Sequence, residues 1–236
     1  MEERIQARRI QTSILNAGER KLLVWLAERM PAWVTSDMLT FTGFIGALII
    51  ATGYALTPHG IQWLWLASFG FFVNWFGDSL DGSLARVRDT QRPVYGFFID
   101  HNIDCINETI MFLGVGMSSL MHMSCALTVL VAYLLLSVYV YITAHLKNEF
   151  KLTYAGLGPT EFRVIAVIVN TLYIFIPALR EAAWDFSFFG GRSFNLTLLD
   201  IIAIVLTAII LLMYLVSIFK DAKYLSGIDP PKDFKK

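Results

Sequence analysis

Four aspartates at helical spacing are the residues of this sequence best suited to chemistry. Asp78 and Asp81 are three positions apart, and Asp100 and Asp104 are four apart. At these spacings the two members of a pair lie on one face of a helix. A short segment around residues 86–93 separates the pairs, so the two helices would run antiparallel and side by side. We therefore expect all four carboxylates to converge.

Such a cluster in an apolar setting requires cations. An aspartate in the middle of a bilayer costs about 2.5–3.5 kcal/mol on insertion scales, and clustered carboxylates also repel one another. Ligand sets made only of oxygen favour hard ions such as Mg²⁺, Mn²⁺ or Ca²⁺. The sequence therefore predicts two divalent cations, an arrangement that holds a phosphate during in-line displacement.

The elements that carry these residues are strongly apolar. Hydrophobic residues make up 56% of the 236 positions, above the roughly 45–50% usual for soluble domains. Each of six apolar stretches approaches the roughly 20 residues that cross a bilayer. The stretches are residues 38–56, 61–77, 97–120, 125–146, 164–179 and 196–219. We predict an all-α integral membrane fold with six transmembrane helices.

A further helix is predicted near the N-terminus. In residues 10–30, leucines and a tryptophan recur at helical spacing between charged residues, which is typical of an amphipathic helix in the membrane interface. Packing against the protein's own cytoplasmic face is the alternative. The predicted regions are an interfacial N-terminal helix in 1–35, a catalytic membrane domain in 36–226 and a cytoplasmic tail in 227–236.

Basic residues predict the orientation. With six spans, seventeen of the nineteen Lys and Arg residues fall on one side, which the positive-inside rule assigns to the cytoplasm. The acidic cluster would then face the cytoplasm from a cell (inner) membrane. The net charge is zero, so no overall field favours nucleic acid. The two cysteines form neither a disulfide framework nor a zinc motif.

The aspartates belong to a longer pattern. The segment from Asp78 to Asp104 resembles the signature of the CDP-alcohol phosphotransferase family, D-x2-D-G-x2-A-R followed after eight or nine residues by G-x3-D-x3-D. All eight fixed positions match. The resemblance implies that Asp78, Asp81 and Asp100 bind two Mg²⁺ or Mn²⁺ ions that hold the pyrophosphate of a CDP-linked donor. It also implies that Asp104 contributes to the metal site and acts as the base on the acceptor hydroxyl.

The same resemblance implies nucleotide contacts. Gly82, Ala85 and Arg86 would lie against the CDP group. The family often has N-x-x-T at the start of the first membrane helix, and this chain has Asp37 in place of the asparagine, followed by Thr40.

Acceptor contacts are expected near the fifth membrane helix. Glu161 and Arg163 open that helix at the cytoplasmic side and could bind the acceptor headgroup. In family members that use phosphorylated inositol, basic residues near this place bind the phosphate. Glu108, one turn past Asp104, could extend the acidic face. The family is often dimeric, and a homodimer is the expected assembly.

The resemblance implies transfer of a phospho-alcohol group to a hydroxyl with release of CMP, in phospholipid synthesis. CDP-diacylglycerol with a polar alcohol acceptor is favoured. The alternative is CDP-choline or CDP-ethanolamine with diacylglycerol as acceptor. A cation-coupled transporter is an alternative of another class, but transporters tend to show inverted repeats and midplane sites, which this sequence lacks. A scaffold without catalysis is disfavoured because all four aspartates are present.

Overall fold

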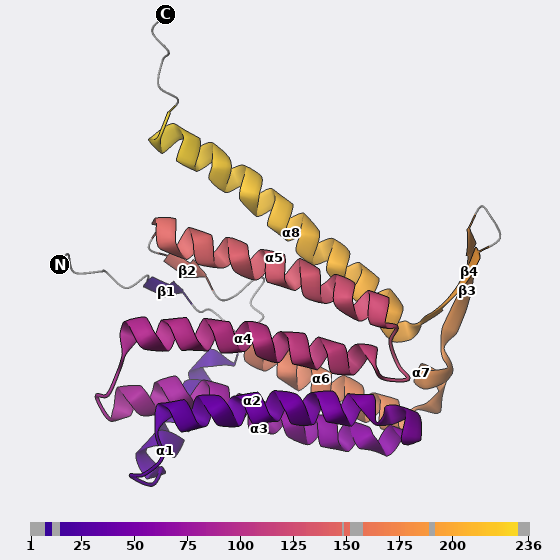
Figure 1. The fold of residues 1–236 in the computed structure, drawn as a ribbon, viewed down its shortest axis with the longest axis horizontal. Helices are drawn as coiled ribbons and strands as arrows, with labels where there is room; N and C mark the ends of the chain where they lie inside the picture. Colours follow the sequence, from indigo (N-terminus) through magenta and orange to yellow (C-terminus); the bar gives the residue numbers. More distant parts are fainter. Residues whose placement is uncertain (1–7, 11–14, 148, 152–157, 189–191, 231–236) are drawn as a thin grey trace, which may run out of the picture.

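Long helices form nearly all of the computed structural model, shown in Figure 1. It describes residues 8–10, 15–147, 149–151, 158–188 and 192–230. Six long helices overlap the six predicted apolar stretches. They are α2 (Ser36–Ala55), α3 (Leu64–Val87), α4 (Pro93–Gly116), α5 (Met123–Lys147), α6 (Pro159–Phe175) and α8 (Leu198–Ile228).

Short elements complete the described chain. Before α2 lies α1 (Asn16–Arg29), and after α6 comes the single-turn helix α7 (Pro177–Glu181). Two 3₁₀ turns, Thr57–His59 and Ile61–Trp63, connect α2 to α3. Four short strands depart from the all-helical expectation. The parallel pair is β1 (Arg8–Ile10) with β2 (Glu149–Lys151), and the antiparallel hairpin is β3 (Ala183–Phe188) with β4 (Arg192–Thr197).

Three of the six long helices meet the length and hydropathy needed to cross a membrane, namely α2, α5 and α8. The other three differ for visible reasons. The acidic residues lie in α3 and α4, where they lower the hydropathy, and α6 has only 17 residues. The helical parts of the predicted fold are thus present, and six membrane spans stay a prediction.

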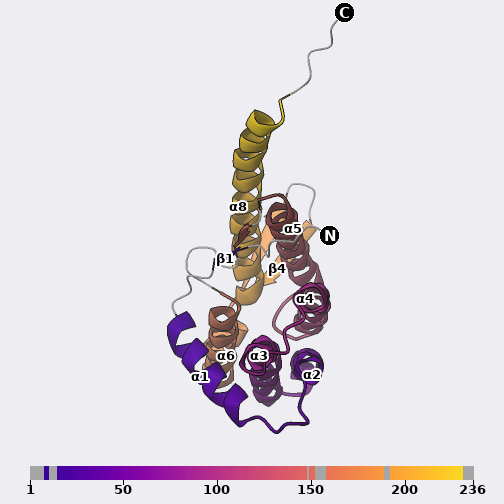
Figure 2. The same ribbon diagram turned by 90° about the vertical axis from the view of Figure 1, so that its left-hand side faces the viewer.

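The helices pack in a continuous series around α2. It packs against both α3 and α4, while α4 packs on α5, α5 on α8, and α3 on α6. Figures 1 and 2 show the C-terminal part of α8 extending away from the other helices. The helices α3 and α4, which carry the four aspartates, therefore flank the same helix.

Glycines set the close approach of α2 and α3. A methyl group on Gly46 would overlap the backbone of Asn74, and one on Gly77 would overlap that of Gly43. Gly43 and Gly46 are buried in this contact. They serve packing within one subunit, so they are not free to pack against a second copy.

The helix α1 lies across one end of the bundle, beside α3 and α6 (Figure 2). Leu23 and Ala27 of α1 are buried against Leu80 and Leu84 of α3. On its outer side Trp25 is half exposed. Packing against the protein's own surface is therefore established for this helix, and its contact with a membrane interface stays a prediction. Residues 1–7, 11–14 and 231–236 of the predicted terminal regions lie outside the described part of the chain.

Candidate metal and transfer site

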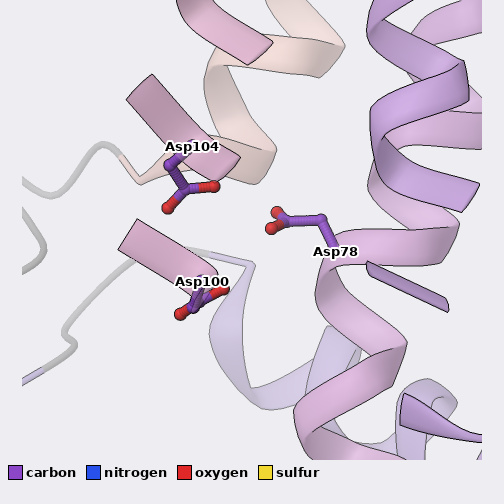
Figure 3. A group of neighbouring side chains, drawn as sticks. All are labelled: Asp78, Asp100 and Asp104. Carbon is purple, nitrogen blue, oxygen red and sulfur yellow. The ribbon is translucent and has the colours of Figure 1, made fainter. Parts of the chain in front are cut away.

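Three of the predicted carboxylates face one another. One oxygen each from Asp78, Asp100 and Asp104 can be chosen so that all three atoms lie within 4.8 Å of one another. Figure 3 shows Asp78 reaching from α3 toward the other two, which stand one turn apart on α4. All three residues are partly buried. The i, i+4 spacing of Asp100 and Asp104 produces their common direction.

The donor set of this cluster suits a hard divalent cation. It consists of carboxylate oxygens from two rigid helices, which is the ligand type that Mg²⁺ and Mn²⁺ prefer. Like charges this close together raise the energy of the ion-free cluster, whereas a cation between them lowers it. The residues present therefore fit the implied metal site.

Asp81 lies outside this group of three. Its Oδ2 accepts a 2.6 Å hydrogen bond from the Thr40 hydroxyl, and its Oδ1 accepts one from the backbone N–H of Gly82. The Ser36 hydroxyl also donates to the Asp81 carbonyl, at 3.0 Å. Convergence of all four aspartates was expected, but the structure brings together three and ties the fourth to the first turns of α2.

Arg163 of α6 contacts the cluster at Asp78. Its Nη2 lies 2.5 Å from Asp78 Oδ2. Its Nε donates a 2.9 Å hydrogen bond to Oδ1 of Asn74, which is fully buried one turn before Asp78 on α3. The sequence analysis missed Asn74. Its position four residues before Asp78 in an apolar stretch was the available signal.

Glu161, the other predicted acceptor contact, has both carboxylate oxygens on backbone donors. Oε1 accepts from the N–H of Leu15 and Oε2 from the N–H of Gly158, both at 2.9 Å. The side chain is buried. In this structure Glu161 joins the start of α6 to the residue that precedes α1.

A second acidic residue, Glu19, also connects α1 to the start of α6. Glu19 of α1 accepts 2.7 Å hydrogen bonds from the Thr160 hydroxyl of α6 and from the indole N–H of Trp75 on α3. Arg88 at the end of α3 donates to the carbonyls of Met30, Pro31 and Val34. These bonds fix α1 and its connection to α2 on the end of the bundle that carries the aspartates.

The predicted nucleotide contacts lie beside Asp81, where α3 ends and α2 begins. Gly82 faces open space, because a methyl group there would meet only the Arg86 guanidinium, at 3.4 Å. Arg86 is exposed and donates to the Ser83 hydroxyl at 3.0 Å, and Ala85 is half-buried. Asp37 lies 3.8 Å from Arg92, and both side chains are exposed.

Glu108 lies one turn beyond Asp104 on α4. Its Oε2 is buried, and no hydrogen bond to it is present within the described residues. A fifth carboxylate therefore stands one turn farther along α4 than Asp104, the last of the three that face one another.

Comparison with known proteins gives a consistent picture. A model of the CDP-alcohol phosphatidyltransferase family matches residues 33–216. The phosphatidylinositol phosphate synthase of Cutibacterium acnes is 33% identical over 102 residues, which are 43% of this chain and 47% of that protein. The archaetidylinositol phosphate synthase of Methanothermobacter thermautotrophicus is 26% identical over 179 residues, covering 74% of this chain and 86% of that protein.

A relative from an animal shares a shorter segment. Cholinephosphotransferase 1 of Gallus gallus is 29% identical over 96 residues, which cover 38% of this chain and 28% of that protein. The matches thus span from about a quarter to most of the relatives' own lengths.

Proposed function

The chain belongs to the CDP-alcohol phosphatidyltransferase family, and from this premise we propose that it transfers a phospho-alcohol group from a CDP-linked donor to a hydroxyl, releasing CMP, in phospholipid biosynthesis. One observation carries the proposal. Asp78, Asp100 and Asp104 face one another within 4.8 Å, inside the segment that the family model matches. Their spacing is that of the signature found in the sequence.

Four aspartates are proposed to hold two divalent cations, Mg²⁺ or Mn²⁺. Asp78, Asp100 and Asp104 already face one another, and Asp81 would join them while its carboxylate stays oriented by the hydrogen bond from Thr40. When bound, the cations would neutralise the donor pyrophosphate and the charge that develops on CMP. The chain's own task is to present these carboxylates from helices that α2 holds together.

Asp104 is the proposed general base. It would accept the proton of the acceptor hydroxyl as that oxygen attacks the phosphorus, while the bond from phosphorus to the CMP oxygen breaks. Its partly buried place on α4 keeps it near the other carboxylates. Glu108, one turn away, is the next candidate for this role.

The cytidine nucleotide is proposed to bind over Gly82. The absence of a side chain at Gly82 leaves space beside Asp81, and Ala85 keeps the next turn of α3 small. Arg86 is exposed at the same end and would pair with phosphate. Thr40 and Asp37 would line the α2 side of this place.

The favoured donor is CDP-diacylglycerol, with a small polar alcohol as acceptor. Two relatives are named for inositol phosphate products. Arg163 beside the cluster would suit an acceptor that carries a phosphate, and Glu161 would act by holding the start of α6. The second candidate is a CDP-amino alcohol as donor with diacylglycerol as acceptor, which the similarity to a cholinephosphotransferase supports.

The proposed setting is a cell membrane with six spans and both termini in the cytoplasm, so that the cluster faces the cytoplasm. A homodimer is also proposed, by way of surfaces other than Gly43 and Gly46. A cation-coupled transporter is disfavoured by the family match over residues 33–216.

One assay tests the reaction. Purified full-length protein with Mn²⁺ or Mg²⁺ is offered CDP-diacylglycerol, CDP-choline and CDP-ethanolamine, each with inositol phosphate, free inositol, glycerol phosphate and diacylglycerol. We expect CMP release only from CDP-diacylglycerol with a polar acceptor. Release only with diacylglycerol would establish the second candidate, and no release from any pair would contradict the proposed reaction.

A further inference from the structure

Arg163 is a guanidinium in direct ion-pair contact with a member of the acidic cluster. It reaches from α6 to Asp78 on α3, and its Nη2 lies 2.5 Å from Asp78 Oδ2. Both side chains are largely buried, with 14% and 21% of their surfaces exposed. An ion pair this shielded from water interacts more strongly than one at an open surface.

Asn74 fixes the position of the guanidinium. Its Oδ1 accepts from Arg163 Nε at 2.9 Å, while its Nδ2 donates to the Gly43 carbonyl of α2, also at 2.9 Å. The bond to Gly43 sets the orientation of the amide, so the oxygen must face Arg163. Because Asn74 is fully buried, neither bond is readily exchanged with water. Three helices thus hold the Arg163 side chain against Asp78.

This arrangement places a positive charge where the proposed cations would bind. Asp78, Asp100 and Asp104 are all acidic, and Arg163 offsets part of the negative charge of this cluster. A divalent cation on the same carboxylate would lie close to the guanidinium, and the two positive charges would repel. We propose that Arg163 is an internal counter-ion that competes with divalent cations for Asp78. The inference rests on the metal site of the proposed function.

The sign of the change in cation affinity on removing Arg163 distinguishes competition from a role in orienting Asp78. Without the guanidinium, the ion-free cluster loses its counter-ion and is destabilised, whereas the cation-filled cluster loses only a repulsion. Linkage then requires that the cation binds more tightly. If Arg163 served only to orient Asp78 as a ligand, its removal would instead weaken cation binding.

The test measures Mn²⁺ binding to the purified full chain, without any CDP-linked compound, by electron paramagnetic resonance of free Mn²⁺. Arg163→Gln is expected to tighten the Kd about tenfold, within the range usual for coupled sites. Arg163→Lys keeps the charge but cannot bond Asn74 and Asp78 through one planar fork, so a smaller tightening is expected. Arg29→Gln, on the exposed side of α1, removes the same charge and should leave the Kd unchanged.

Thermal unfolding supplies a second measurement. In chelator, Arg163→Gln should unfold at a lower temperature than the parent, and Mn²⁺ should raise its midpoint by more than it raises the parent's. If Arg163→Gln fails to fold, Arg163→Lys decides. An unchanged or weakened Kd in the folded variant overturns the proposal. Tightened Mn²⁺ binding in Arg163→Gln, together with no CMP release by the parent, would support the counter-ion and reject the proposed reaction.

Discussion

Carboxylates at the two ends of the bundle have opposite surroundings. At the end of the bundle beside the β3–β4 hairpin (the hairpin end), Asp200 of α8 has no exposed surface. It accepts four hydrogen bonds at 2.6–3.0 Å, two from the N–H and Nδ1 of His122 and two from the N–H and hydroxyl of Thr197. At the other end, Asp78, Asp100 and Asp104 face one another.

The difference distinguishes a structural acid from a functional one. A carboxylate surrounded by donors is already stabilised and has little affinity left for a ligand. Carboxylates that face each other repel, and a bound cation relieves that repulsion. The site can therefore be recognised by acids that face one another, as well as by which acids are present.

The largest effect is expected from Asp104→Asn. A carboxamide cannot accept the hydroxyl proton, so CMP release should fall by about 10²–10⁴, with little change in thermal stability. The measurement is CMP release, with calorimetry of the CDP-linked donor on the same preparation. Asp89→Asn, in the loop between α3 and α4, is the matched control and should keep the parent rate. Turnover near the parent rate in Asp104→Asn would move the base to Glu108.

Asp200→Asn should show the reverse pattern. The NH₂ group of the new amide would face the N–H and O–H donors of His122 or Thr197, which leaves those donors without an acceptor. We therefore expect the free energy of unfolding to fall by about 1–3 kcal/mol. The rate per folded molecule should stay close to that of the parent. Thermal unfolding in detergent measures the stability, and CMP release normalised to the amount of folded protein measures the rate. Asp229→Asn, exposed after the other end of α8, is the control. Lost turnover in fully folded Asp200→Asn would end the distinction between the two ends.

Thr40→Val tests a smaller effect at the catalytic end. It removes the 2.6 Å hydrogen bond that holds Asp81 but keeps the shape of the side chain. One hydrogen bond contributes about 0.5–1.5 kcal/mol net, so donor binding should weaken about fivefold. Calorimetry with the CDP-linked donor measures it. Thr42→Val is a control on the same helix, since its hydroxyl bonds only the Met38 carbonyl among the described residues. Equal effects from both variants would remove the special role of Thr40.

The smallest effect on the protein is expected from single cysteines that place the two ends in the membrane. In a parent lacking Cys105 and Cys125, His59→Cys at the hairpin end and Thr90→Cys at the catalytic end are both exposed. Activity should not change. An impermeant thiol reagent added outside intact cells should label His59→Cys and spare Thr90→Cys. The opposite labelling would place the catalytic end outside the cell.

Local spacing was sufficient to predict the helices and most of the cluster. Apolar stretches of near-span length marked the six long helices, and i, i+4 spacing marked the common direction of Asp100 and Asp104. The placement of Asp81 was not predictable in this way, because Thr40 is 41 positions away in the chain and the bond depends on how α2 meets α3. The same holds for Glu161, whose partner Leu15 lies 146 positions earlier.

Other features had local signals that went unused. Thr197 and Asp200 form a capping box at the start of α8, a pattern visible as Thr-x-x-Asp before an apolar run. Strands β3 and β4 lie almost wholly between the predicted apolar stretches 164–179 and 196–219, and hydropathy alone assigned no structure to that connection. The contact of Arg163 with Asn74 joins residues 89 positions apart and needed the structure.

The joint between α1 and α6 has a consequence for how the chain matures. During synthesis α1 leaves the ribosome before any of the long helices. Its residue Glu19 accepts a hydrogen bond from Thr160, which follows 141 positions later in the chain. This anchor of α1 cannot form until five of the six long helices have begun to be made. The packing of α1 on α3 can form earlier, so the bond from Thr160 is a late addition, and a nascent chain stopped before residue 158 would lack this anchor.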